Sequence, residues 1–192
     1  MKNDIILSGV GGQGILSIAS VIGLAAVEND IFLKQAEVHG MSQRGGDVQS
    51  HLRLSDKYIY SDLIPLGNAD LIISMEPMES LRYLPWLSKN GWLVTNSNPL
   101  VNINDYPPVE EIVKEINRIE NHVLIDADSI AKEFGSARSG NIVLLGAASH
   151  FINNMPFESL ENAVRKLFAR KGEEIVELNL KALKAGRDFS AQ

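Results

Sequence analysis

The chain has 192 residues, enough for one domain with a substantial core, and its formal net charge is −6, from 18 Lys and Arg against 24 Asp and Glu. This balance offers no basic footprint for nucleic acid and no basic amphipathic segment for an anionic membrane. Because the chain has no cysteine, it cannot form a disulfide or ligate an iron–sulfur cluster through thiolates. Its apolar runs are too short for a signal region or a membrane span, which predicts a cytoplasmic protein.

A glycine-rich turn near the start of the chain is the first strong feature. Residues 5–14, IILSGVGGQG, join a predicted buried strand to a predicted helix over 15–27. Gly9, Gly11 and Gly14 fit the spacing G-x-G-x-x-G, which allows a tight turn and close approach of a ligand. The first N–H groups of the helix would attract an anion. A dinucleotide site also needs a carboxylate about 20 residues later, and Glu37 is the candidate for it. In the alternative interpretation, the glycines only allow the strand and the helix to pack closely, and the turn binds no ligand.

After a short strand predicted at 31–33, residues 37–46, EVHGMSQRGG, break both helical and strand periodicity and predict a structured loop. Its charged and longer polar side chains are Glu37, His39, Gln43 and Arg44. Arg44 precedes Gly45 and Gly46, so a guanidinium would lie beside main chain that a carboxylate or phosphate can approach. In the alternative interpretation, Arg44 pairs with an internal carboxylate such as Glu37 or Glu76, and the glycines only permit a bend.

The remaining pattern predicts alternating strands and helices. Alternation over 48–54 predicts a strand that turns at 55–57 into a second strand at 58–60, an antiparallel hairpin. Further strands are predicted at 69–74, 91–95 and 122–126, and helices at 76–84, 109–116, 129–135, 141–153, 157–169 and 173–185, with Asp128 capping the helix that begins at Ser129. This order predicts a single domain over 1–192, a three-layer α/β/α fold with a mixed, mainly parallel sheet and a C-terminal helical stretch. Ligands of such sheets bind outside the carboxyl ends of the strands.

Other chemistry lacks a signal in the sequence. His39 and His51 lack the spacing of a metal site, so no metal is predicted. The serines at 8, 42 and 50 lie in no G-x-S-x-G elbow, which argues against acyl-enzyme chemistry. Asp126 and Asp128 fit a strand end and a helix cap. Asn141, at the head of an apolar helix, either caps that helix or points its amide into a cleft.

Four motifs together resemble the gamma-type domain of the 2-oxoacid:ferredoxin oxidoreductases. They are GVGGQG at 9–14, AEVHGMSQRGGDVQSHLR at 36–53, GNIVLLGA at 140–147 and NLKALKAG at 179–186. The resemblance runs over essentially the whole chain. The motif HGMSQRGG is similar to the sequences of the indolepyruvate branch of the family. The combination of the glycine turn with MSQRGG is much more specific than either motif alone.

The resemblance implies a heteromeric enzyme that oxidatively decarboxylates an aryl 2-oxoacid, such as indolepyruvate, with coenzyme A. The products would be an acyl-CoA, carbon dioxide and reduced ferredoxin. It further implies that thiamine diphosphate and 4Fe-4S clusters belong to a larger partner subunit and that this chain alone binds no cofactor. The absence of cysteine agrees with this division.

From the resemblance we expect the chain to shape a reaction site. The glycine turn (Gly9, Gly11, Gly12, Gln13 and Gly14) and the segment Gln43, Arg44, Gly45 and Gly46 would face the partner's thiamine cleft or the path of coenzyme A. Arg44 would pair with an anion, and Gln13 and Gln43 would position polar groups. Two alternatives stay open: a free-standing NAD(P)-binding oxidoreductase with Glu37 on a ribose, and an accessory assembly subunit without catalytic residues.

Overall fold

The computed structural model describes residues 2–39, 45–136 and 138–191. Within these ranges, a six-stranded sheet has the order β2-β3-β1-β4-β5-β6. The strands are β1 (Lys2–Val10), β2 (Phe32–His39), β3 (Asp47–Ser55), β4 (Ala69–Ser74), β5 (Leu87–Asn96) and β6 (His122–Ile125). β3 runs antiparallel to both β2 and β1, whereas β1, β4, β5 and β6 pair in parallel. The predicted mixed, mainly parallel sheet is confirmed.

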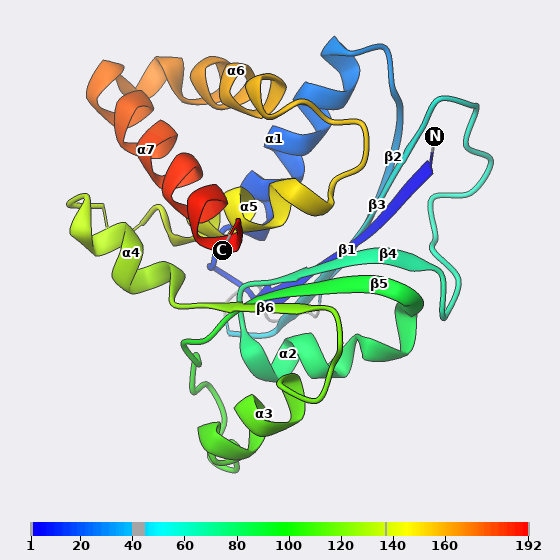
Figure 1. The fold of residues 1–192 in the computed structure, drawn as a ribbon, viewed down its shortest axis with the longest axis vertical. Coiled ribbons are helices and arrows are strands. Elements are labelled where there is room, and N and C mark those ends of the chain that lie inside the picture. The colour runs from blue at the N-terminus through cyan, green and yellow to red at the C-terminus, as the bar shows by residue number, and fades with distance from the viewer. Residues whose placement is uncertain (1, 40–44, 137, 192) are drawn as a thin grey trace.

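Helices cover both faces of this sheet, as Figure 1 shows. On one side lie α1 (Ile15–Glu28), α5 (Gly140–Ala148), α6 (Phe157–Phe168) and α7 (Glu173–Ser190); on the other lie α2 (Pro77–Arg82) and α3 (Val109–Ile116). Successive side chains of a strand point to opposite faces, so Ile5 and Leu7 join the core under α1 and α5, and Ile6 joins the smaller core under α2 and α3. The predicted three-layer α/β/α arrangement is confirmed.

The C-terminal helices are fixed to this body by a close crossing of α5 and α7. A Cβ built on Gly186 would lie 1.8 Å from the Val143 carbonyl oxygen, and one on Gly146 would lie 2.0 Å from the Leu183 carbonyl oxygen. The two glycines therefore let the helix backbones touch, a separation that no side chain would permit. The remaining helical elements are α4 (Ala127–Glu133) and the 3-10 helices η1 (Leu84–Trp86), η2 (Ser149–Phe151) and η3 (Ala169–Lys171).

The antiparallel hairpin differs from the predicted one. Residues 58–60 form no strand, and β3 pairs instead with β2, which reaches His39, so that residues 37–39 belong to a strand and not to a loop. The physical reason is that β1 and β2 already occupy both edges of β3. The segment after β3 is held elsewhere: the Arg53 guanidinium, paired with buried Asp4, donates to the carbonyl oxygens of Ser61 and Leu63 at 3.0 Å each.

The cap of α4 also differs from the prediction. Because β6 ends at Ile125, Asp126 occupies the cap position, and its carboxylate accepts the Ser129 N–H at 2.9 Å. Asp128 lies inside the first turn and accepts hydrogen bonds from Asn96 and Asn98.

In the parts of the chain that the structure describes, no helix is both long and apolar enough to cross a bilayer.

Candidate functional site

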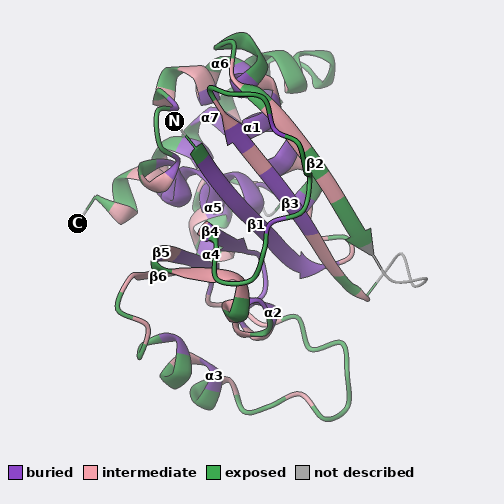
Figure 2. Ribbon diagram, turned by 90° about the vertical axis from the view of Figure 1, so that its right-hand side faces the viewer, coloured by how far each residue is buried: buried purple, intermediate pink, exposed green. Residues whose placement is uncertain are grey.

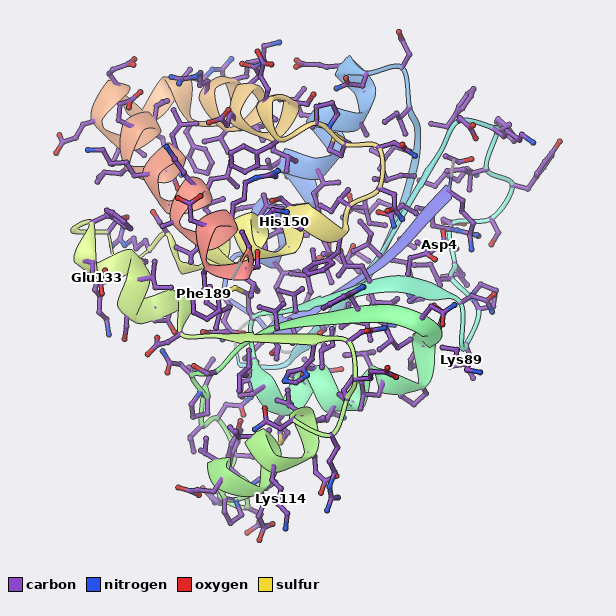
Figure 3. All side chains as sticks on the ribbon, in the orientation of Figure 1. Asp4, Lys89, Lys114, Glu133, His150 and Phe189 are labelled. Atoms are coloured by element: carbon purple, nitrogen blue, oxygen red, sulfur yellow. The ribbon has the colours of Figure 1, made fainter. Side chains whose placement is uncertain are left out.

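The two glycine clusters, far apart in the sequence, lie side by side at the carboxyl end of β1. The Gly11 N–H donates to the Gly46 carbonyl oxygen at 2.8 Å, and the Gly45 N–H donates to the Gly11 carbonyl oxygen at 3.4 Å. A third segment reaches the same place, because the Asn102 side-chain amide donates to the Gly45 carbonyl oxygen at 2.6 Å. Three loops thus meet at this edge of the sheet. Asp4 and Lys89, near the amino ends of β1 and β5, mark the opposite edge in Figure 3.

The glycines within these clusters have different roles. Gly12 and Gly45 have positive φ angles of 106° and 77°, and a Cβ built on either meets no described atom within 4 Å. Both are exposed, so they present bare main chain at the surface. Gly9, in contrast, is buried, and a Cβ there would lie 2.8 Å from both Gln13 Oε1 and Ile15 Cδ1. Gly9 therefore serves packing of the strand against the turn.

Gln13 closes the crevice between β1 and β4. Its Oε1 accepts the Val10 N–H at 2.7 Å, and its Nε2 donates to the Met75 carbonyl oxygen at 3.2 Å. The helices that follow β1 and β4 go to opposite faces of the sheet, which makes this crevice the switch point where open α/β sheets commonly bind ligands. The Gln13 amide already joins the two strand ends there, and the side chain also borders the cavity described below.

Asn141 ties α5 to the glycine turn. Gly14 is the N-cap residue of α1 and has a left-handed φ of 81°. Asn141 Nδ2 donates to the Gly14 carbonyl oxygen at 3.0 Å, and a Cβ built on Gly14 would lie only 2.6 Å from that nitrogen. Ser139 holds the cap position of α5, so Asn141 does not cap its own helix. Its amide instead fixes the turn, and the residue is among those that line the cavity described below.

A cavity of about 880 Å³ opens beside the turn. Its walls come from the glycine turn, the loop after β5, the corner between α4 and α5, and the start of α7, and they include Gly12, Asn98, Asp128, Arg138, Asn141, Lys171 and Asn179. Asp128 Oδ2 accepts hydrogen bonds from the side-chain amides of Asn96 at 3.0 Å and Asn98 at 3.3 Å. One wall of the cavity therefore carries polar groups that are held in place. Arg138 and Lys171 are exposed cations of this cavity. Its volume and charges suit an extended ligand with anionic groups.

A smaller hollow of about 370 Å³ lies on the other side of the turn. It is lined by Gly11, Gly12, Gly14, Leu16, Val48 and Glu37, among others. Glu37 is exposed near the end of β2, and β3 separates that strand from β1. In a dinucleotide-binding half the acidic residue lies at the end of the strand beside the glycine turn. Glu37 therefore borders the turn without the strand order that a dinucleotide site uses.

Glu76 lies at the same edge and holds the loop that follows β5. It is fully buried, and its carboxylate accepts the Glu79 N–H at 2.8 Å and the Leu100 N–H at 3.3 Å, as well as the Tyr106 hydroxyl. Burial and this carboxylate together raise the pKa of Tyr106. The sequence analysis considered Glu76 only as a possible partner of Arg44 and gave no sign of the loop that it anchors. The Glu-Pro pair before an apolar helix is a cap signal that could have been used.

Gln43 and Arg44, expected to shape the site, lie outside the described residues, as does Ser42. His51 is buried: its Nδ1 accepts the Ile64 N–H at 2.9 Å, and burial lowers its pKa, so it acts as a structural residue. Within the described ranges, no group of three or more His, Cys, Asp or Glu side chains could hold a metal ion.

This architecture is that of an α/β protein that presents exposed main chain at the carboxyl edge of a mixed sheet. Residues 4–189 match the family model described as pyruvate ferredoxin/flavodoxin oxidoreductase. The chain belongs to this family, and its similarity to named subunits is substantial.

The indolepyruvate oxidoreductase subunit IorB of Archaeoglobus fulgidus is 38% identical over 195 residues, covering 97% of this chain and 94% of that protein. The subunit of the same name from Pyrococcus horikoshii is 35% identical over 192 residues, covering 95% and 93%. The expected family membership is confirmed.

A solved structure shares the fold. It is the 2-oxoglutarate:ferredoxin oxidoreductase from Magnetococcus marinus with 2-oxoglutarate, coenzyme A and succinyl-CoA bound, which superposes with a TM-score of 0.78 at 23% identity over 99% of this chain and 31% of that chain. At this level of identity the likeness shows the fold alone.

Proposed function

We propose that this chain is the small, cluster-free subunit of a heteromeric, thiamine-dependent 2-oxoacid:ferredoxin oxidoreductase in the cytoplasm, and that indolepyruvate or another aryl pyruvate is its substrate. The assembled enzyme converts the 2-oxoacid and coenzyme A into an acyl-CoA, carbon dioxide and reduced ferredoxin. The names of the relatives support the substrate class. The observation that carries the proposal is the meeting of Gly11 with Gly45 and Gly46, which presents exposed main chain beside a large polar cavity.

In this proposal the electron carriers belong to the partner. The chain has no cysteine and therefore no thiolate for a 4Fe-4S cluster. Thiamine diphosphate and the clusters are assigned to a larger subunit, which supplies the carbanion chemistry and electron transfer. The isolated small subunit is then inactive, and its own residues act by binding and orienting groups at the edge of the partner's site.

The cavity of about 880 Å³ is the proposed contact for coenzyme A. Arg138 and Lys171 would neutralise phosphates, since guanidinium and ammonium groups are the usual phosphate partners in proteins. Asp128 would accept an N–H or hydroxyl of the ligand, because two amides already hold its carboxylate in place. Gly12 lets the ligand approach main chain without a side chain between them.

Arg44 is the proposed partner of an anionic group of the substrates. Arg44→Ala should lower turnover of the assembled enzyme about 10-fold or more, as expected for loss of a charge-assisted contact, while the melting temperature stays unchanged. Arg118→Ala is the matched control, because Arg118 is an exposed arginine that follows α3, the helix on the sheet face opposite α1, and it contacts Glu115. Equal turnover of the wild type and both variants would refute a role for Arg44 in the site.

Titration of the isolated chain separates this proposal from its alternatives. Binding of coenzyme A without binding of NADH supports it, and the crevice already closed by Gln13 leads us to expect this result. Binding of NADH that is lost in Glu37→Gln would establish the free-standing nicotinamide enzyme. Binding of neither molecule, with full activity of an assembled Arg138→Ala/Lys171→Ala variant, would leave an accessory assembly role.

A further inference from the structure

The loop between β5 and α3 projects apolar side chains into solvent next to the glycine clusters. We call residues 97–106 the strap. Leu100, Val101 and Ile103 of the strap are 40%, 65% and 47% exposed. Figure 2 shows the segment between β5 and α3 as an exposed loop that swings away from the body of the molecule. Three exposed aliphatic side chains within four residues form a local apolar patch, whereas exposed apolar residues on most surfaces occur singly.

The strap is held in place at three points, although it has no regular secondary structure. Glu76 accepts the Leu100 N–H and the Tyr106 hydroxyl from a fully buried position, and Asn102 donates to the Gly45 carbonyl oxygen at 2.6 Å. The apolar side chains are therefore displayed from an anchored backbone. An ordered surface of this kind loses little conformational entropy when a partner covers it.

The charged residues of the strap and of the first turn of α3 are all acidic: they are Asp105, Glu110 and Glu111. Lys114 follows in the last turn of α3, and the cations Arg138 and Lys171 lie on the cavity side of the strap. Two copies meeting through this surface about a two-fold axis would bring the same acidic groups together, which costs free energy. The surface instead suits a different protein that offers an apolar groove bordered by lysine or arginine side chains.

We propose that the strap is the docking element for the large subunit, inserting Val101 and Ile103 into an apolar groove with a basic rim. This inference rests on the proposed function, which supplies the large subunit. The strap also borders the large cavity through Pro99 and Leu100, so docking here places the partner at the cavity mouth. The joined glycine clusters then lie at the same junction, because Asn102 links the strap to Gly45.

The test is co-purification of a tagged form of this chain with the co-expressed thiamine- and cluster-carrying large subunit, followed by measurement of the dissociation constant of the complex. Val101→Asn/Ile103→Asn should weaken association about 10-fold or more, as expected when apolar anchors of an interface are made polar. Val27→Asn is the matched control: Val27 is 61% exposed and lies in the last turn of α1, at the far end of that helix from the glycine turn. It should leave association unchanged.

Both variants should keep the wild-type melting temperature, since the substituted side chains are exposed. Wild-type association in the strap variant would overturn the inference while leaving the proposed function intact. Failure of the wild-type chain to bind the large subunit would instead refute the proposed function. Sedimentation of the isolated chain provides a further check: a dimer that the strap substitutions convert to a monomer would assign the surface to a second copy and overturn the inference.

Discussion

Replacing Gly14 by alanine tests the joint between the glycine turn and α5. The residue has a φ of 81°, and holding an alanine in the left-handed region costs about 1–2 kcal/mol. The added Cβ would also lie 2.6 Å from Asn141 Nδ2, so the amide must move and lose its 3.0 Å hydrogen bond to the Gly14 carbonyl oxygen. Such a hydrogen bond contributes about 0.5–1.5 kcal/mol. We expect Gly14→Ala to lower the free energy of unfolding by about 2–3 kcal/mol.

Urea unfolding of a four-member cycle measures this coupling. The members are the wild type, Gly14→Ala, Asn141→Ala and the double variant, with Gly12→Ala as a control for backbone strain without a steric contact. Because Asn141→Ala removes the group that collides with the new Cβ, the double variant should be about 1 kcal/mol more stable than additivity predicts. Additive effects within about 0.3–0.5 kcal/mol would refute the reasoning, since the two residues would then act independently.

Three further outcomes are expected. Gly186→Ala should destabilise the protein by about 3 kcal/mol in thermal unfolding, since its Cβ would lie 1.8 Å from a carbonyl oxygen of α5; unchanged stability would contradict the tight crossing. Burial raises the pKa of Glu79 above its ordinary 4.5, so stability should fall as the pH rises from 4.5 through the raised pKa, and Glu79→Gln should flatten that dependence in urea titrations. Tyr106→Phe should loosen the strap, measured as faster amide hydrogen exchange at Leu100 with little change elsewhere; equal exchange would show that Glu76 holds the strap without the hydroxyl.

Local patterns in the sequence predicted most of the elements. β4 has the predicted bounds, α3 begins after its proline pair, and the turn at 9–14 connects a buried strand to a helix. These features depend on short-range rules, such as the period of apolar residues and the backbone limits of glycine and proline, which act within a few neighbours. The pairing of β3 was missed because it depends on which edges are free, and residues 55–60 resemble a local hairpin.

Some features of the candidate site could likewise be predicted from the sequence, whereas others depend on the fold. The sequence alone determined that the chain presents glycine-rich main chain and holds no thiol, because composition and glycine spacing are fixed by the order of residues. The fold was needed to show that Gly11 meets Gly46, that Asn102 reaches Gly45, and that the Gln13 amide is hydrogen-bonded between two strand ends. Hydrogen bonds between segments far apart in the chain depend on the order of the strands in the sheet. That order must bury the apolar side chains on both faces of the sheet, each under its own layer of helices.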